Sequence, residues 1–459
     1  MLTSLEINGL RGFASKEVIK FSVPNGNLGS GLTVLVGANN AGKSTAIEAL
    51  RAVGQIQKPS FSQGRRNQNA GDQIYIHAVG LDSRETTLKS IRAGSSETEV
   101  IKQNGGIDLS TLLILPSRRV FNPYFGRSES SRNDYMNQIG FPPSRASSLD
   151  PFAYRLFTIE KNRESFDAVL RRVLDPVPDW SIDQMDTGQY FLKIRKGAAT
   201  HTSEGLGEGL VSLLYIIDAL YDSKEGYTIA VDEPELSLHP ALQRKLSALL
   251  LEYASTRQII LATHSPYFAC LEALHNGGSV ARVHVVGEAS KISQLTTVTA
   301  QSMVGLIQNQ NNPHILGLNA QEVFFIEDRV ILVEGQEDVV FFKCVQNAIQ
   351  TTLAGTFFGW GVGGASNMMK VAAILRDLGY AKVVGILDAN RSDLVIALAD
   401  QFPSYHFLAI PSDDVRTKKA VPSKPAVTGL LDDDNISIRP EYFERTYQLF
   451  EKANQYLNG

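Results

Sequence analysis

The sequence has little cysteine and no long apolar run. Its two cysteines, Cys270 and Cys344, stand far apart without the spacing of metal ligands, which argues against a disulfide framework or a zinc site and indicates a reducing cytosol. No uninterrupted apolar run approaches the length that spans a membrane. Residues Met1–Glu6 lack the basic and apolar regions of a signal peptide. We therefore expect a cytoplasmic protein that does not contact membranes.

The net charge and the length of the chain further limit the kinds of protein that the sequence could encode. The formal net charge is -4, so the overall charge gives no evidence for a polyanionic partner, and any nucleic-acid surface would have to be a local patch. A hydrophobic content of 43% and a charged content of 20% are typical of a globular protein with sizeable cores. A chain of 459 residues should contain two or three domains.

The most informative segment is a glycine-rich loop that lies between an apolar run at 32–36 and a helical pattern at 46–53. Strand, loop and helix in this order form a phosphate-binding loop, in which backbone N–H groups and the helix N-terminus face the phosphates. The lysine reaches the β- and γ-phosphates and the serine hydroxyl ligates Mg²⁺. The segment predicts a site for ATP and Mg²⁺ that is formed by Gly37, Asn39, Asn40, Gly42, Lys43, Ser44 and Thr45.

Two later apolar runs, at 228–231 and 258–262, end in polar side chains. Neither run has a helical period, which is typical of strands buried on both faces. Asp232 is placed to hold Mg²⁺, and Glu233 is placed to act as the general base toward the attacking water. His264 follows the second run, and its spacing from the acidic pair favours a contact with the γ-phosphate.

A second glycine-rich segment, Ser203–Gly209, opens the helix that precedes the acidic strand. Such a helix start is an anion site, but the phosphate loop already has a helix of its own. Two chains facing each other would give every nucleotide both sites. We therefore expect a homo-oligomer that contains at least a head-to-tail dimer, with Gly207 and Gly209 facing the nucleotide of the partner subunit.

Between these motifs the chain alternates between β-like and irregular segments. Short β-like pieces at 73–81, 86–91, 99–103 and 111–115 suit an antiparallel sheet beside the nucleotide core. The segment from 116 to about 149 reads as irregular and is followed by a helical pattern to 174. It contains a basic stretch that is a candidate for DNA contact, although solvated surface arginines are the alternative; its members are Arg118, Arg119, Arg127, Arg132 and Arg145.

The C-terminal part of the chain repeats the pattern of a strand that ends in an acid. Glu334 follows an apolar run at 330–333, and Asp388 follows a second run at 382–387. Carboxylates at adjacent strand ends can share a divalent metal, Mg²⁺ or Mn²⁺, of the kind that drives phosphodiester cleavage. Ordinary strand-end acids are the alternative.

The nucleotide motifs resemble the ABC-type ATPases of the SMC and OLD (overcoming-lysogenisation-defect) families. By this resemblance Gly37–Thr45 is the Walker A loop, Gly205–Gly209 the signature motif and Asp232–Glu233 the Walker B pair, while His264 is the switch histidine. The segment Pro116–Arg119 lies where the Q-loop is expected but contains no glutamine. The signature serine is replaced by Gly207, which implies slow turnover.

The order of motifs after residue 329 resembles the Toprim domain of OLD-family nucleases, with Glu334 and Asp388 at matching positions and Asn390 in place of the second acid. The resemblance implies an α/β protein in which an ABC/SMC-type P-loop ATPase domain precedes a Toprim-like domain. Its expected parts are an ATPase domain at 1–300 with a short helical or irregular insertion at about 118–200, a linker at 301–328, and a Toprim-like domain with a C-terminal helix at 329–459.

The resemblance implies a role in prokaryotic anti-phage defence, and it leaves two main functions open. The first is an ATP-dependent sensor and scaffold that controls a separate effector nuclease, as in the ATPase component of PARIS-type systems. The second is a self-contained, ATP-regulated OLD-type endonuclease that uses a divalent metal in its Toprim-like domain. A third hypothesis, a DNA-repair ATPase, is disfavoured by the short insertion and the C-terminal domain.

Overall fold

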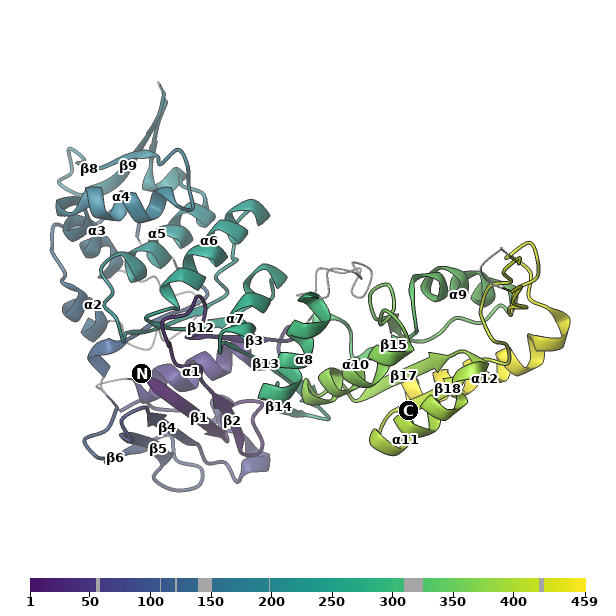
Figure 1. Cartoon of the computed structure of the whole chain (residues 1–459). Coiled ribbons are helices and arrows are strands. Elements are labelled where there is room, and N and C mark those ends of the chain that lie inside the picture. Colours follow the sequence, from purple (N-terminus) through teal and green to yellow (C-terminus); the bar gives the residue numbers. More distant parts are fainter. Residues whose placement is uncertain are drawn as a thin grey trace. The chain divides into compact units, whose positions relative to one another are not determined.

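The computed structural model describes residues 1–54, 58–107, 109–119, 122–138, 151–197, 199–308, 325–420 and 425–459. The chain divides into two compact units, Met1–Gln294 and Leu295–Gly459. Each unit has its own sheet structure and its own hydrophobic core, with a mixed α/β composition (Figure 1).

The central sheet of the first unit has six strands in the order β14-β13-β3-β12-β11-β7. All neighbouring pairs are parallel except the pair formed with the edge strand β14. The strands β3, β11 and β12 are buried along their whole length, as their unbroken apolar runs predict. The bounds of the six strands are Leu32–Val36 (β3), Leu112–Leu115 (β7), Thr228–Asp232 (β11), Gln258–Ala262 (β12), Ser279–Val286 (β13) and Ala289–Gln294 (β14).

A second sheet in this unit is antiparallel and has the order β2-β1-β4-β5-β6. Helix α1, Lys43–Val53, belongs to a core that includes residues of both sheets, such as Ile76 and Ile260. The alternating burial of β4 and β5 places one face of this sheet in that core. Its strands are Leu2–Asn8 (β1), Glu17–Lys20 (β2), Tyr75–Gly80 (β4), Glu85–Ser90 (β5) and Thr98–Gln103 (β6).

Strand β7 corrects one expectation. We predicted that the β-like piece at 111–115 belongs to the antiparallel sheet, but β7 pairs in parallel with β11 at the edge of the central sheet. All four of its residues are buried, which is typical of a strand in a parallel sheet. The segment that follows β7 therefore begins beside the acidic end of β11.

The insertion contains more regular structure than we predicted from the sequence. Helix α2 lies in the stretch that we expected to be irregular, and its buried Tyr135 shows why, since packing against the unit orders a segment with a weak helical pattern. The insertion elements are Arg132–Gln138 (α2), Pro151–Lys161 (α3), Arg163–Arg171 (α4), Asp179–Gln184 (β8), Tyr190–Lys196 (β9) and Ala199–Thr202 (β10). The three strands form a separate antiparallel sheet.

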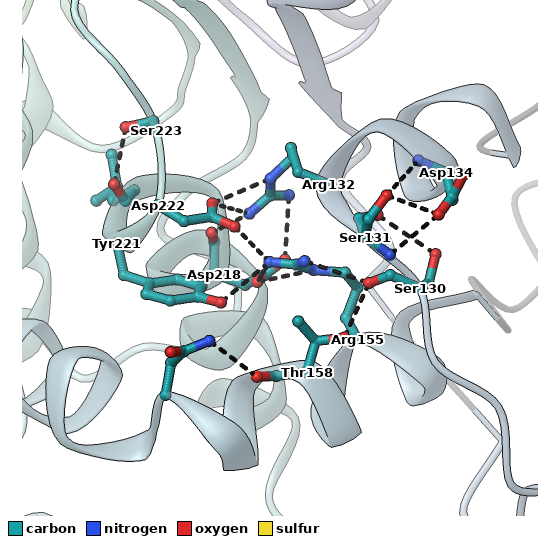
Figure 2. Close-up of polar contacts among 12 residues, drawn as sticks. Ser130, Ser131, Arg132, Asp134, Arg155, Thr158, Asp218, Tyr221, Asp222 and Ser223 are labelled. Carbon is teal, nitrogen blue, oxygen red and sulfur yellow. Dashed lines mark hydrogen bonds and ion pairs between the residues drawn. The ribbon is translucent and has the colours of Figure 1, made fainter.

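A buried ion-pair network joins the insertion to helix α5, Glu208–Tyr221 (Figure 2). Arg155 of α3 is 1% exposed and lies 2.7 Å from Asp218, whose side chain is 2% exposed. Arg155 also lies 2.7 Å from Asp222, and Arg132 of α2 lies 2.6 Å from Asp222 and 3.2 Å from Asp218. Buried charges persist only when they are paired, so these contacts hold α2 and α3 against α5.

The remaining helices of the first unit are Pro240–Tyr253 (α6) and Leu271–His275 (α7). His239 precedes α6, and its side chain accepts a hydrogen bond from the Ala241 N–H, with Pro240 in the first turn. This cap matches the sequence pattern of a proline at the start of a helix.

The second unit contains a parallel sheet with the order β16-β15-β17-β18. Its strands are Arg329–Leu332 (β15), Thr356–Phe357 (β16), Lys382–Leu387 (β17) and His406–Ala409 (β18). Its longer helices are Thr297–Gln308 (α8), Gln336–Ala348 (α9), Ala365–Asp377 (α10), Ser392–Gln401 (α11) and Pro440–Asn458 (α12). Phe342 of α9 and Phe450 of α12 are buried in one core with Val384 of β17.

Helix α8 corrects the expected linker boundary. We placed the end of the ATPase domain at 300 and a linker at 301–328, yet the units divide after Gln294 and α8 belongs to the second unit. Thr299 donates a hydrogen bond to Asp377 at the end of α10, at 2.6 Å. A tertiary contact thus orders a helix whose sequence has no strong period. Residues 309–324 of the expected linker lie outside the described residues.

None of the helices in the described ranges combines the length and the hydropathy that crossing a membrane requires.

We expect the Asp218→Ala substitution to destabilise the first unit by about 3–5 kcal/mol, because it leaves Arg155 and Arg132 buried with incomplete charge compensation. The measurement is urea unfolding followed by the fluorescence of Trp180, in a Trp360→Phe background that removes the other tryptophan. Asp179→Ala is the control, because Asp179 pairs with arginines at the surface and is 57% exposed; it should cost about 0–1 kcal/mol. Equal losses in the two variants would contradict the assigned role of the network.

Candidate nucleotide site

The phosphate loop connects β3 to α1 in the expected order. Gly37 has a φ of 143°, and a Cβ atom at this position would lie 2.0 Å from the Val283 carbonyl oxygen, so only glycine fits against β13. Helix α1 begins at Lys43, directly after Gly42. The loop therefore leaves the N-terminal N–H groups of α1 beside the end of β3, which is the arrangement that binds phosphate.

Lys43 and Ser44 extend from the start of α1 toward the ends of the neighbouring strands. The Lys43 ammonium donates hydrogen bonds to the Gly37 and Ala38 carbonyl oxygens at 2.9 and 3.0 Å. The Ser44 hydroxyl donates to Asp232 Oδ1 at 3.1 Å. A hydroxyl and a carboxylate at this separation suit Mg²⁺, which takes one or two protein oxygens and keeps waters and phosphates as its other ligands.

Glu233 follows β11 in an unusual backbone conformation. Its φ is 51°, and its N–H donates to the Ala262 carbonyl oxygen at 2.7 Å. Non-glycine residues in this region store strain that the surrounding contacts must hold. The turn thus places both acids of the pair at the edge of the sheet where β3 and β12 also end.

His264 follows β12 and faces the phosphate loop. Its Nδ1 lies 3.4 Å from the Lys43 ammonium. Its backbone N–H donates to Glu235 Oε1 at 2.5 Å, and Glu235 also accepts a hydrogen bond from the Thr263 hydroxyl at 2.7 Å. Glu235 therefore holds the end of β12 in position. From the sequence we placed Glu235 only in a segment, Glu235–His239, that resembles the D-loop of ABC-type ATPases. The sequence did not indicate this contact, because the partner lies 29 positions away.

Burial changes the protonation behaviour of the two basic groups. Desolvation lowers the pKa of Lys43 to about 8, against the negative charges of Asp232, Glu233 and Glu235, which favour the protonated amine. Desolvation also lowers the pKa of His264, and the charge of Lys43 lowers it further. His264 is thus neutral near pH 7, and its one ring N–H can donate a hydrogen bond to a phosphate oxygen.

The signature-like segment lies at the start of α5. Gly207 precedes the helix with a φ of -64°, and a side chain added there would meet open space. A Cβ atom at Gly209 would lie 2.3 Å from the Ser237 carbonyl oxygen, so α5 packs closely against the segment that follows the acidic pair. The Ser237 hydroxyl donates to Glu208 at 3.0 Å across the same contact.

Arg119 lies at the nucleotide site, a position that the sequence analysis did not predict for it. Its guanidinium donates to the carbonyl oxygens of Asp232 and Glu233, both at 2.7 Å, and to the Ser212 hydroxyl of α5 at 2.9 Å. From the sequence we listed it in a stretch that either contacts DNA or is solvated at the surface, and its exposure of only 3% contradicts both alternatives. The same correction applies to Arg132, which is held by the ion-pair network.

Arg118 and Arg127 remain exposed, and Arg145 lies outside the described residues. Arginines that lie close together in the sequence therefore have different environments in the fold. Arg119 and Arg132 turn inward, because backbone carbonyls or carboxylates compensate their charges.

The second unit brings Glu334 and Asp388 together, as the parallel pairing of β15 and β17 predicts. The Asp388 N–H donates to Glu334 Oε1 at 3.4 Å. Asp338, in the first turn of α9, accepts a hydrogen bond from the Gly335 N–H at 2.8 Å. Asn390 is exposed, and its side chain donates to the Asp413 carbonyl oxygen at 3.4 Å.

The carboxylates of this group influence one another. Burial, followed by the charges of Asp338, Glu334 and Asp414, raises the pKa of Asp388 to about 8. Burial also raises the pKa of Asp338 to about 6. Asp338 was absent from our sequence-based site, although its position four residues after Glu334, at the start of the following helix, could have indicated it. From the sequence we noted Asp414 only within a loose match at 413–418 to a further acid and a basic residue of OLD-family proteins. Over the described ranges, no group of three or more metal-binding side chains is arranged to hold an ion.

Two known proteins are similar to this chain in sequence. The chain is 24% identical over 314 residues to the Septu protein PtuA of Bacillus thuringiensis, covering 60% of this chain and 74% of that protein. It is 25% identical over 156 residues to the endonuclease GajA of Bacillus cereus (strain VD045), covering 34% of this chain and 25% of that protein. The chain therefore spans only a quarter of the length of GajA.

Solved structures of SMC heads are also similar, with lower sequence identity. For an SMC head bound to the C-winged helix domain of ScpA, the TM-score is 0.42 and the identity is 15%, and the match covers 65% of this chain and 99% of that chain. The SMC head domain from Thermotoga maritima has a TM-score of 0.38 and 15% identity, and it covers 64% of this chain and 99% of that chain.

The family described as "AAA domain, putative AbiEii toxin, Type IV TA system" matches residues 32–269. This range is more than half of the chain and contains the phosphate loop, the acidic pair and His264. The protein is an ATPase, and this chain belongs to that AAA-domain family.

Proposed function

We propose that this chain is an ATP-dependent sensor and scaffold in prokaryotic anti-phage defence, which assembles and controls a separate effector nuclease. The observation that carries the proposal is the meeting of Lys43, the Ser44–Asp232 pair, Glu233 and His264 at one edge of the central sheet. The similarity to a Septu protein and the resemblance of the motifs to OLD-family ATPases support the defence context.

In this proposal each side chain has a distinct role. Lys43 binds the β- and γ-phosphates, and Ser44 and Asp232 hold Mg²⁺. Bound Mg²⁺ would neutralise charge that develops on the phosphates. Glu233 orients the attacking water and accepts its proton, while the neutral His264 contacts the γ-phosphate.

The same proposal includes a head-to-tail dimer of ATPase domains. The N-terminus of α5, with Gly207 and Gly209, is an anion site that the chain's own phosphate loop does not need. A partner subunit that presents this helix start would complete each nucleotide site. Without the signature serine at Gly207 that contact has one hydroxyl fewer, so we infer that ATP stabilises an assembled state and is hydrolysed slowly.

The second candidate function is a self-contained endonuclease. Two observations favour it. The Asp388 N–H donates a hydrogen bond to Glu334, and the pKa of Asp388 is raised by burial and by the charges of the neighbouring carboxylates, as is typical of sites that bind a cation. The relative named as an endonuclease supports it over a short range. Asn390 counts against it, because an amide adds no charge to a metal site and cannot act as a base.

Affinity for ATP should fall as the pH rises through about 8. Lys43 is protonated below its pKa of about 8, and phosphate binding favours the protonated form. Above that pH, ATP binding therefore requires Lys43 to take up a proton. Affinity should then decrease by about tenfold for each pH unit. Calorimetry with a non-hydrolysable ATP analogue between pH 7 and 9.5 measures this, because His264 is neutral throughout that range.

The control for this titration is Lys43→Ala, which should show no measurable nucleotide binding at any pH. Binding of normal strength in Lys43→Ala would remove the phosphate loop from the site. An affinity that stays constant from pH 7 to 9.5 in the unsubstituted protein would contradict the assigned protonation of Lys43.

Glu233→Gln should retain ATP but lose hydrolysis, because glutamine keeps the shape of the side chain and cannot accept the proton. We expect ATP to convert this variant into a species of twice the single-chain mass, measured by light scattering after gel filtration. Lys43→Ala should keep the single-chain mass under the same conditions. Full ATP turnover in Glu233→Gln would remove Glu233 as the base, and an unchanged mass with ATP would exclude the dimer.

A nicking assay on supercoiled plasmid in the presence of Mn²⁺ distinguishes the two candidate functions. If the chain is a scaffold, the purified protein leaves the plasmid intact. In cells that also express the genomic neighbour, the double variant Glu334→Ala/Asp388→Ala then protects from phage as well as the unsubstituted chain does. Plaque counts measure the protection, and Lys43→Ala should abolish it.

The opposite pattern supports the endonuclease. Nicking by the purified chain that disappears in Glu334→Ala/Asp388→Ala, together with loss of protection in that variant, would overturn the scaffold proposal. The variant Asp393→Ala is the matched control, because this acid lies near the pair in sequence but belongs to α11.

A further inference from the structure

Arg119 occupies a position that a surface arginine would not take. It follows β7, it is 3% exposed, and its three nitrogen atoms donate to four oxygen atoms. Two of these acceptors are the main-chain carbonyls of Asp232 and Glu233, each at 2.7 Å, and a third is the Pro116 carbonyl at 2.8 Å. The guanidinium thus binds the backbone of the turn that carries Asp232 and Glu233, called the catalytic turn below.

The backbone of that turn needs restraint. Glu233 has a φ of 51°, a conformation that costs a non-glycine residue free energy and persists only where contacts hold it. Its N–H donates to the Ala262 carbonyl at 2.7 Å, and its C=O accepts from Arg119 at 2.7 Å and from the Leu236 N–H at 3.1 Å. Of these three restraints, only Arg119 also binds the Asp232 carbonyl and α5, so its removal lets the turn relax and carry the Glu233 carboxylate with it.

The fourth acceptor extends the contact to α5. Arg119 Nε donates to the Ser212 hydroxyl at 2.9 Å, one turn after the glycine-rich start of that helix. Near the other end of α5, Asp218 and Asp222 bind Arg155 and Arg132 of the insertion (Figure 2). Helix α5 is therefore fixed at one end to the insertion and at the other, through Arg119, to the catalytic turn.

The charge of Arg119 supports this arrangement. Burial lowers the pKa of Arg119 to about 10, against the charges of Asp232, Glu235 and Glu233, so the side chain stays protonated near neutral pH. A planar guanidinium can serve several acceptors at once, whereas a lysine ammonium acts as a single point charge. Arginine is the side chain that can bridge two carbonyls and a hydroxyl in different elements.

We propose that Arg119 is a positioning residue, which holds the Asp232–Glu233 turn in its hydrolytic geometry and couples this turn to the signature-like helix α5. The proposal rests on the role of Glu233 as general base given above. It adds a route by which a movement of α5 or of the insertion changes the rate of ATP hydrolysis.

The test separates turnover from binding. Arg119→Ala should lower kcat for ATP hydrolysis by about 100-fold, because a small displacement of a catalytic group has an effect of this size, while the Kd for a non-hydrolysable ATP analogue changes less than threefold. Arg119→Lys should fold with the charge retained and lower kcat by about tenfold. If Arg119→Ala does not fold, Arg119→Lys alone decides the outcome.

The matched control is Arg66→Ala. Arg66 is also buried, and it donates to the Phe61 carbonyl and to Asp72, with no hydrogen bond to the catalytic turn. This substitution should lower the thermal unfolding temperature and leave kcat unchanged at a temperature at which all variants are folded. An equal loss of kcat in Arg66→Ala and Arg119→Ala would mean that Arg119 acts only through stability.

The link to α5 has its own measurement. Ser212→Ala should lower kcat less than Arg119→Ala does, and the double variant should match Arg119→Ala alone, because both substitutions break one connection. Losses of kcat that multiply would refute the coupling to α5. If Arg119→Ala has a normal kcat while Glu233→Gln is inactive, the positioning role of Arg119 is wrong and the role of Glu233 stands. If Glu233→Gln has full turnover, the role of Glu233 as general base is wrong.

Discussion

Parallel pairing of three fully buried strands, β3, β12 and β11, is the constraint on which the rest of the ATPase unit depends. Their hydrogen-bond register brings their carboxyl ends to one edge of the sheet. The phosphate loop, the acidic pair and His264 each continue one of these strands, so they meet although they lie far apart in the sequence. Since the strands are buried on both faces, the meeting point is held by a hydrophobic core that tolerates little displacement.

Around this edge the structure uses buried charge to connect elements. Glu235 binds the end of β12, Arg119 binds the turn after β11, and Asp218 binds the arginines of the insertion. Each of these groups would be costly to bury alone and is compensated by a partner from another element. The resulting contacts run from the insertion through α5 to the acidic pair.

The second unit repeats the principle of acids at adjacent parallel strand ends with a different result. Glu334 and Asp388 lie together, and burial followed by the charges of Asp338 and Glu334 raises the pKa of Asp388, but Asn390 contributes no charge. The two units thus differ: the main side chains of the nucleotide site are in contact with one another, whereas the carboxylate site has an amide in place of an acid.

The sequence by itself determined the phosphate loop, the acidic pair, the histidine after β12 and the buried character of their strands, because each depends on local spacing and on unbroken apolar runs. It also predicted the approach of Glu334 to Asp388. Only the tertiary structure decided that β7 joins the central sheet, that α8 is a helix of the second unit, and that Arg119 and Arg132 turn inward while Arg118 stays exposed. These outcomes depend on partners that lie far away along the chain, and no local pattern of residue types encodes which carbonyl or carboxylate a given arginine will meet.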